Sequence, residues 1–189
     1  DQVENYDPEL HYRIARGYME ARRYREGCEL FLYLHRAGGV ERAEEALYLA
    51  FVCAASVPSP GRAYEIARRY MDEYPGGEWY DTLTLAAGQM RAREPDWPEV
   101  IRHFSEVLQV KPGHQSAAEC LYLLGYAHFM EEQFEQARVR LLDLRTRFPK
   151  SDLMDDALYW SAMSAIFAGD FETGAREFEA LLQQFPETL

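Results

Sequence analysis

Histidine, cysteine and acidic side chains are the residues of this sequence that could carry out catalysis or bind a metal. The five histidines show neither HExxH nor HxxxH spacing, which would place two imidazoles on one face of a helix. The three cysteines are far apart and form no CxxC pair, so their spacing indicates neither a zinc site nor a disulfide framework. We expect no metal, no cofactor and no catalytic role for these side chains, which are His11, His35, His103, His114, His128, Cys28, Cys53 and Cys120.

Adjacent acidic residues give no catalytic pair either. Glu131 and Glu132, like Asp155 and Asp156, are neighbours in sequence and would lie on different faces of a helix. Such pairs are typical of solvated faces, or of first turns that interact with the helix dipole. The sequence also has no GxSxG, Walker A or Rossmann glycine pattern. We therefore expect a protein that is not an enzyme.

Tyrosine recurs in a column whose chemistry favours recognition. Its side chain offers a large, rigid contact area with a polar tip, which suits a surface that binds another protein. The same spacing is also typical of rings that pack between neighbouring helices and leave only their hydroxyls in water. Both interpretations stay open for the column, which is Tyr12, Tyr48, Leu85, Tyr122 and Tyr159.

A repeat of 37 residues must position these side chains, because proline recurs at Pro75, Pro112, Pro149 and Pro186. Apolar and small residues recur with the same period in other columns. Phe104, Leu141 and Phe178 form one such column; Val107, Leu144 and Leu181 form another. The sequence therefore divides into five units, at about 1–38, 39–75, 76–112, 113–149 and 150–186.

Each unit has the pattern of two antiparallel helices. Apolar residues follow helical spacing in two runs with a turn segment between them, and no stretch alternates with the period of a strand. The periodic prolines should end each second helix, since a helix does not continue through them. Pro60 and Pro98 are tolerated in a first turn. The segment 116–119 has the pattern of a capping box that opens a first helix.

The fourth unit resembles the tetratricopeptide (TPR) signature at Leu121, Leu124, Gly125, His128, Ala137, Leu141, Leu144 and Pro149. The resemblance implies an all-α fold, a right-handed α-solenoid of about five helix hairpins, which we expect to form one domain over 1–189. The second unit departs from the signature, because Phe51 occupies the small-residue position and Pro60 the usual aromatic one.

The length of the unit and its aromatic-Pro endings narrow the resemblance. Tyr74-Pro75, Phe148-Pro149 and Phe185-Pro186 are most similar to bacterial envelope TPR proteins, namely the Tol–Pal coordinator and the outer-membrane assembly lipoprotein. That resemblance favours a periplasmic or envelope location over a cytoplasmic one. The sequence begins at Asp1, without a targeting segment, so we expect a processed chain or a piece of a longer protein.

The resemblance also implies that the first helix of each unit lines a concave groove that holds a partner helix or peptide. A Lys and Asn clamp for chaperone tails is absent from the matching positions, which favours a partner with bulky apolar side chains. The groove residues expected on this basis are Tyr12, Tyr48, Leu85, Gln89, Arg93, Tyr122, Tyr126, Phe129, Met130, Tyr159, Met163, Ile166 and Phe167.

Apolar residues on the fourth and fifth units require a cover, because six of the groove residues there would share one exposed face. The last helix also carries Phe178, Leu181, Leu182 and Phe185 with no later helix to pack on them. A partner helix, a further C-terminal helix or a second copy could cover these surfaces. The alternative function is thus a structural repeat segment that self-associates through its C-terminal end.

Charge and hydropathy exclude two other classes of partner. Acidic residues outnumber Lys and Arg by 32 to 20, giving a formal net charge of −12. Nucleic acid and anionic membrane surfaces are therefore poor partners. No run of 18 apolar residues is present, so we expect no membrane span.

Overall fold

The computed structural model describes residues 7–37, 42–58, 60–93 and 96–186, and within them it contains helices and no strand. The all-α fold class expected from the sequence is confirmed. In chain order the helices are α1 (Pro8–Glu20), α2 (Tyr24–Ala37), α3 (Ala43–Ala55), α4 (Pro60–Glu73), α5 (Tyr80–Arg93), α6 (Trp97–Val110), α7 (Ala117–Met130), α8 (Phe134–Arg147), α9 (Met154–Phe167) and α10 (Phe171–Gln184).

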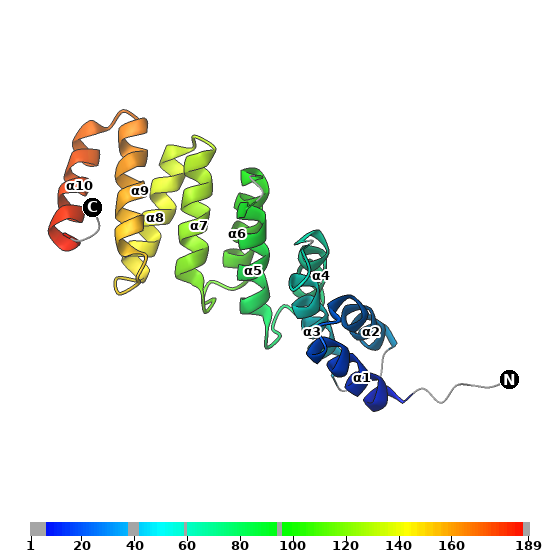
Figure 1. Ribbon diagram of the computed structural model, residues 1–189. Coiled ribbons are helices and arrows are strands. Elements are labelled where there is room, and N and C mark those ends of the chain that lie inside the picture. Colours follow the sequence, from blue (N-terminus) through cyan, green and yellow to red (C-terminus); the bar gives the residue numbers. More distant parts are fainter. Residues whose placement is uncertain (1–6, 38–41, 59, 94–95, 187–189) are drawn as a thin grey trace. The chain divides into compact units, whose positions relative to one another are not determined.

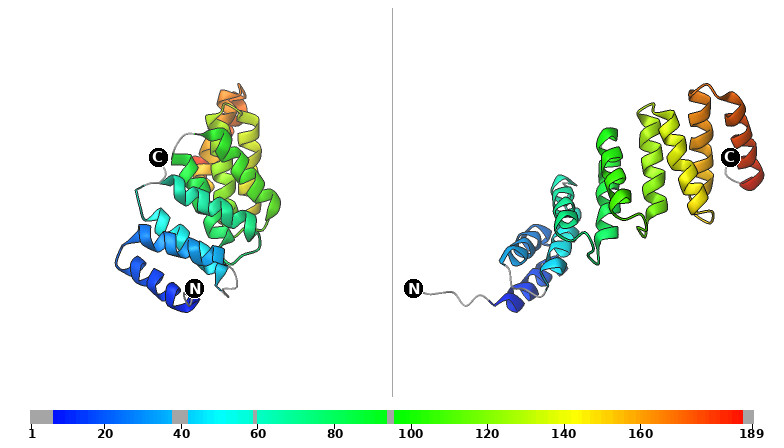
Figure 2. Two further views of the ribbon diagram at one scale, coloured as in Figure 1. Left: turned by 90° about the vertical axis from the view of Figure 1, so that its right-hand side faces the viewer. Right: turned by 180° about the vertical axis from the view of Figure 1, so that it is seen from behind.

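The helices follow one another as hairpins within two compact units, residues 1–90 and 91–189 (Figures 1 and 2). The first unit holds α1 to α4 and most of α5, with α2 packed on both α1 and α3. The second unit holds α6 to α10. There α8 packs between α7 and α9, while α7 and α9 also contact each other (Figure 1). Each unit thus stacks its hairpins on their neighbours.

The periodic prolines end the second helix of the hairpins, as the sequence predicts. The helices α4, α6, α8 and α10 each end two residues before a proline of the 37-residue column. The residue between helix and proline has left the helical region, with φ −134° and ψ 79° at Lys111 and φ −126° and ψ 58° at Phe148. A proline ring disfavours helical backbone in the residue before it, so the period of the prolines sets the period of the helices.

Small residues set how closely the helices of a hairpin approach. A Cβ atom added to Gly125 of α7 would lie 2.7 Å from Cγ of Leu141 on α8. In the last hairpin, a Cβ on Gly174 would lie 2.5 Å from Cγ1 of Ile166. Leu121, Leu141 and Leu144 are fully buried behind this contact. The close approach allows the leucines of α7 and α8 to form one core.

Two sequence details have a different outcome in the structure. Ser116 lies at the start of α7, yet its side chain makes no capping hydrogen bond, so the predicted capping box is wrong. Its ψ of 36° is far from the extended backbone that a capping serine needs. In the second unit of the repeat, Phe51 is buried and α3 still packs on α4.

A hydrogen-bond network fixes the turn after α4 in the first compact unit. Tyr70 of α4 donates its hydroxyl to Oε1 of Glu44 on α3 at 2.5 Å, and the same oxygen accepts the backbone N–H of Glu78 at 2.8 Å. The Tyr70 hydroxyl in turn accepts the backbone N–H of Trp79 at 3.0 Å. A Cβ on Gly77 would overlap both the Tyr70 hydroxyl and the Glu44 carboxylate, so the turn needs glycine at this position.

Replacing Gly77 should therefore destabilise the first compact unit. Gly77→Ala forces apart the Tyr70–Glu44 hydrogen bond, and we expect a loss of unfolding free energy on the order of 1–3 kcal/mol. Gly76→Ala is the matched control, because nothing lies within 4 Å of a Cβ at that position. Urea unfolding followed by circular dichroism measures both. Equal stability of the two variants would contradict the network.

Burial of His128 should make stability depend on pH. The side chain is 7% exposed, and its Nδ1–H donates to Oε1 of Gln133 at 2.7 Å. Burial lowers the pKa of His128, while the Gln133 contact opposes the shift and Arg140 adds to it. The unfolded chain, with a histidine pKa of about 6.5, then takes up this proton before the folded chain does. Folding stability is full above about pH 6.5 and falls as the pH drops below that value.

The variant His128→Asn tests this dependence, because asparagine does not titrate and keeps a donor to Gln133. We expect the free energy of unfolding to fall more between about pH 7.5 and about pH 5.5 in the wild type than in the variant. Urea titrations at the two pH values give the comparison. Identical pH dependence in both proteins would show that His128 titrates as it does in the unfolded chain.

Candidate partner-binding face

Ring contacts connect the aromatic side chains of the second compact unit, and we call seven of them, without Tyr159 and Phe178 beside Trp160, the aromatic cluster. Trp160 of α9 lies at its centre, with ring centroids 4.8 Å from Tyr126 and 4.9 Å from Phe129, both on α7. Contacts of this kind are edge-to-face or tilted, the arrangements that aromatic pairs prefer. The cluster consists of Trp97, Tyr122, Tyr126, Phe129, Phe134, Trp160 and Phe167.

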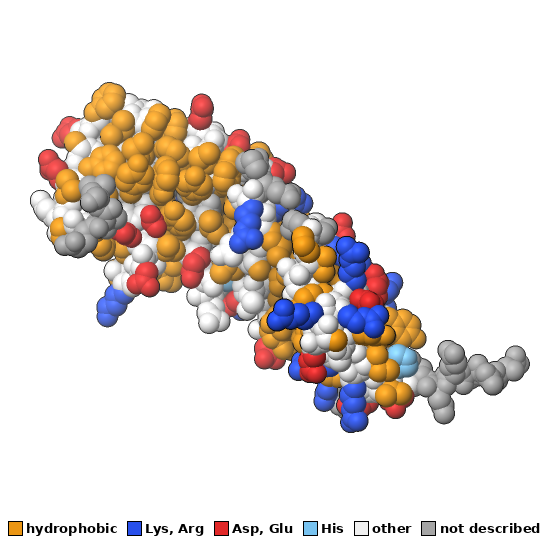
Figure 3. All heavy atoms as spheres, viewed as in Figure 1, with side chains coloured by type: hydrophobic (Ala, Val, Ile, Leu, Met, Phe, Trp, Pro, Cys, Tyr) orange, Lys and Arg blue, Asp and Glu red, His pale blue; other side chains and the backbone are white. Residues whose placement is uncertain are grey.

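The cluster is packed at its centre and open at one end. Phe129, Phe134 and Phe167 contact one another at 5.5 to 5.6 Å between ring centroids. Phe167 is nevertheless 59% exposed, and Met130 at the end of α7 is 42% exposed. Hydrophobic side chains gather over this part of the molecule in Figure 3. The packing therefore holds a rigid apolar surface in contact with solvent.

The charge on this face is negative. Neither α7 nor α9 contains Lys or Arg, whereas Glu119, Asp155 and Asp156 lie in their first turns. Burial raises the pKa of Asp156, and the neighbouring Asp155 raises it further. Burial likewise raises the pKa of Tyr122, with a smaller contribution from Asp156. An apolar surface with carboxylates at one end follows from these two helices.

The tyrosine column divides between the two interpretations that the sequence left open. Tyr12 is 7% exposed; its hydroxyl donates to Oε1 of Glu45 at 2.7 Å, and it is part of the core. Tyr48 is half-buried and stacks on Trp79 with 4.7 Å between ring centroids. In the second compact unit, Tyr122 and Tyr159 are half-buried as well. The column thus packs on neighbouring rings along one side and keeps part of its surface open.

The remaining predicted groove residues differ in how exposed they are. On α5, Leu85 is half-buried, whereas Gln89 and Arg93 are exposed. Met163 of α9 is half-buried. Ile166 is half-buried too, and it packs where Gly174 leaves room on α10. Ring contacts thus connect Tyr122, Tyr126, Phe129, Tyr159 and Phe167 through Trp160. A role of the predicted residues in binding a partner remains a prediction.

Three members of the aromatic cluster were not among the predicted groove residues: Trp97, Phe134 and Trp160. The first two belong to a column of large residues in the 37-residue repeat, continued by Phe171. That column gave a usable signal, because it places a ring at the start of α6, α8 and α10. Trp160 follows Tyr159 directly, and no repeat column marks it.

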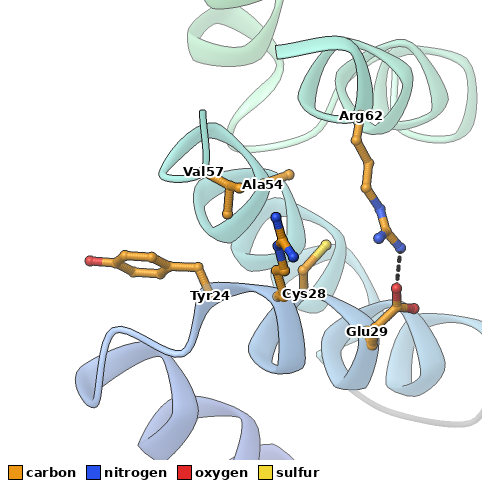
Figure 4. Close-up of a pocket in the computed structure, with 7 residues that line it drawn as sticks. Tyr24, Cys28, Glu29, Ala54, Val57 and Arg62 are labelled. Atoms are coloured by element: carbon orange, nitrogen blue, oxygen red, sulfur yellow. Dashed lines mark ion pairs between the residues drawn. The ribbon is translucent and has the colours of Figure 1, made fainter. Parts of the chain in front are cut away.

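A separate small cavity lies in the first compact unit (Figure 4). Its volume is about 250 Å3, and an ion pair between Arg62 and Glu29, at 2.6 Å, lies beside it. Cys28 contributes to the wall, and burial raises the pKa of its thiol. A cavity below the usual ligand range of about 300–1,000 Å3, with a protonated thiol, is a weak candidate for a ligand site.

Among the described residues, no group of three or more His, Cys, Asp or Glu side chains is placed to hold a metal ion. No helix in the same ranges is long and apolar enough to cross a membrane.

The sequence profile of the tetratricopeptide repeat family matches residues 119–151 and 156–188. These two matches coincide with the hairpins α7–α8 and α9–α10 that carry the aromatic cluster. These two segments have the sequence pattern of tetratricopeptide repeats. The TPR resemblance stated for the fourth unit is thereby confirmed, and the fifth unit matches as well. No curated protein matches the sequence.

Solved TPR structures share the fold. MamA from Desulfovibrio magneticus RS-1 is 15% identical with a TM-score of 0.66, covering 96% of this chain and 97% of its own. MamA of strain AMB-1 is 13% identical with a TM-score of 0.68, covering 96% and 93%. A tetratricopeptide repeat protein from Parabacteroides merdae is 13% identical with a TM-score of 0.69, covering 96% and 68%. At such identities the likeness concerns the fold, an α-solenoid of TPR hairpins.

Proposed function

We propose that this TPR protein is a non-enzymatic scaffold that binds a helix or peptide of another protein on the face of α7 and α9. Tetratricopeptide repeats and the TPR fold support a role in protein–protein interaction. One observation carries the choice of face: Phe167 is exposed, yet its ring is held against Phe129 and Phe134 in the aromatic cluster. Little side-chain freedom is then lost on binding, which favours affinity.

The charge of the face narrows the chemistry of the partner. Bulky apolar side chains fit the open end of the aromatic cluster, because Phe167 and Met130 present apolar area there. At the other end, Glu119 and Asp156 favour a Lys or Arg. The partner we propose is an amphipathic segment with large apolar residues at one end and a basic residue at the other.

A bacterial envelope setting is part of the proposal. It is supported by the 37-residue unit and by endings such as Phe148-Pro149 and Phe185-Pro186. A periplasmic location follows from the same resemblance. Fractionation of cells that express the full-length protein at native level, with marker proteins for each compartment, tests it; recovery with the cytoplasmic marker would contradict it.

A second candidate function is self-association through the C-terminal hairpin. It is favoured by the exposure of two large side chains on α10, Phe171 at 68% and Leu182 at 49%.

Introducing a negative charge at the open end of the cluster tests the scaffold function. Peptides selected from a displayed library on the immobilised protein are measured by fluorescence polarisation. Phe167→Glu and Met130→Glu should weaken binding by at least about 10-fold, the equivalent of about 1.4 kcal/mol. Both side chains are largely exposed, so the melting temperature should change little.

Leu142→Glu is the matched control, because Leu142 is also exposed but lies on α8. It should leave peptide binding unchanged. Equal binding by all three variants would place the partner site elsewhere. Phe129→Ser is a poorer probe, since Phe129 contacts three other rings and its loss should also lower stability.

A further inference from the structure

A cavity in the second compact unit lies among α6, α7 and α8, and none of the described residues that line it belongs to the aromatic cluster. Its volume is about 350 Å3, within the usual range of about 300–1,000 Å3 for small-molecule sites. Leu108 of α6 and Leu121 and Leu124 of α7 form its apolar side. The charged residues that line it come from α8 and are Arg140, Asp143 and Arg147. The cavity thus combines apolar and charged walls, as ligand sites do.

Two of these charged residues already have partners within the chain. Nη1 of Arg147 donates to Oδ2 of Asp143 at 3.1 Å, and Nη2 donates to the backbone oxygen of Pro112 at 2.7 Å. The negative charge of Asp143 is therefore offset by Arg147, and the Pro112 carbonyl holds the guanidinium in place. The charge of the cavity that remains to be paired is that of Arg140.

Arg140 lacks a counter-charge. Within the part of the chain that the structure describes, it forms no ion pair, and its Nε is buried without a hydrogen-bond acceptor. Burying a donor without an acceptor costs free energy, and the cost is larger for a charged group. Arg138 also has a buried Nε without an acceptor, but its Nη1 lies 3.8 Å from Glu135 and 3.7 Å from Asp170. An anion in the cavity would give Arg140 the partner that Arg138 already has.

The repeat shows how the same two positions are paired in the following joint between hairpins. Thirty-seven residues after Leu108 and Arg140 stand Arg145 of α8 and Glu177 of α10. Nη1 of Arg145 donates to Oε1 of Glu177 at 3.1 Å, so an ion pair connects these two helices. On α6 and α8 the base of that pair is replaced by Leu108 and the acid by Arg140. These two positions therefore hold one cation and lack the anion that would pair with it.

The walls of the cavity select the kind of anion. A guanidinium binds a carboxylate through two parallel N–H donors, and their charges cancel one to one. A phosphate group carries close to two negative charges at neutral pH, of which Arg140 could pair only one. The leucines of α6 and α7 favour a hydrocarbon group, which leaves water when it lies against them. With a net charge of −12, the chain has no general attraction for anions, so binding must depend on this local arrangement.

We propose that this cavity binds a small carboxylic acid with an apolar body. The carboxylate pairs with Arg140, and the hydrocarbon part lies against Leu108, Leu121 and Leu124. The site is separate from the partner-binding face of α7 and α9 and needs no second protein. It therefore goes beyond the scaffold function and does not depend on it.

NMR titration of the 15N-labelled chain with 3-phenylpropionate tests the proposal. We expect saturable shifts of the amide signals of residues 105–109 and 140–147, which flank the cavity, with a dissociation constant of about 1 mM or below. The alcohol 3-phenylpropanol has a similar apolar body without the charge, and inorganic phosphate has charge without the apolar body. Each should bind at least about 10-fold more weakly than the acid.

Two substitutions test the pairing with Arg140. Arg140→Met removes the guanidinium and keeps most of the side-chain length, so affinity for the acid should fall at least about 10-fold. Leu108→Glu places a carboxylate at the position that pairs across the following joint, and it should compete with the acid for an intact Arg140. Arg138→Met is the matched control, because Arg138 lies on α8 but does not line this cavity; it should bind like the wild type. Circular dichroism confirms that the variants are folded.

The proposal is wrong if the wild-type chain shows no saturable shift with the acid. Equal affinity of the wild type and Arg140→Met would show that this guanidinium does not bind the carboxylate. Equal affinity for the acid and for 3-phenylpropanol would reduce the contact to a hydrophobic one and would contradict the role of charge. Shifts confined to the aromatic cluster would place the acid on the partner-binding face instead.

Discussion

A hairpin of two helices cannot bury its apolar side alone, and the rest of the structure follows from this constraint. Gly125 brings α7 and α8 close enough for Leu141 to fill the space between them. On the side of α8 that α9 covers, Leu141 and Leu144 pack with Ala157 of α9 in one hydrophobic cluster. Each hairpin thus completes the core of one neighbour and offers an incomplete core to the next. Apolar surfaces that no neighbouring hairpin covers are therefore the candidates for contacts with other molecules.

Helices and their limits were predictable from the sequence because the signals act locally. A proline disfavours helical backbone in the residue before it, so the proline column marked the ends of α4, α6, α8 and α10. The capping box failed because its side chains can act only when the backbone at Ser116 is extended, and that angle follows from the turn that precedes α7. The sequence shows that the capping side chains are present, whereas the backbone of the preceding turn determines whether they can form the capping hydrogen bonds.

The candidate site was predictable only in part, because its contacts join separate helices. Tyr126, Phe129 and Phe167 were predicted as one face, and the structure places them in one cluster. Tyr12 stands in the same repeat column as Tyr122 and Tyr159, yet it is buried and its hydroxyl donates to Glu45. Trp160 stands in no repeat column, so nothing in the spacing distinguished it. The repeat column of a residue determines the face of the helix on which it lies, whereas side chains from other helices determine how much of it is exposed.

Phe134 and Phe171 show how one repeat position can have two environments. Both stand at the start of a second helix and in the same column of the repeat. Phe134 has Phe167 against it, and the pair is part of the aromatic cluster. Phe171 is largely exposed. The same side chain at the same position is therefore packed or open according to the residues that the neighbouring helices place against it.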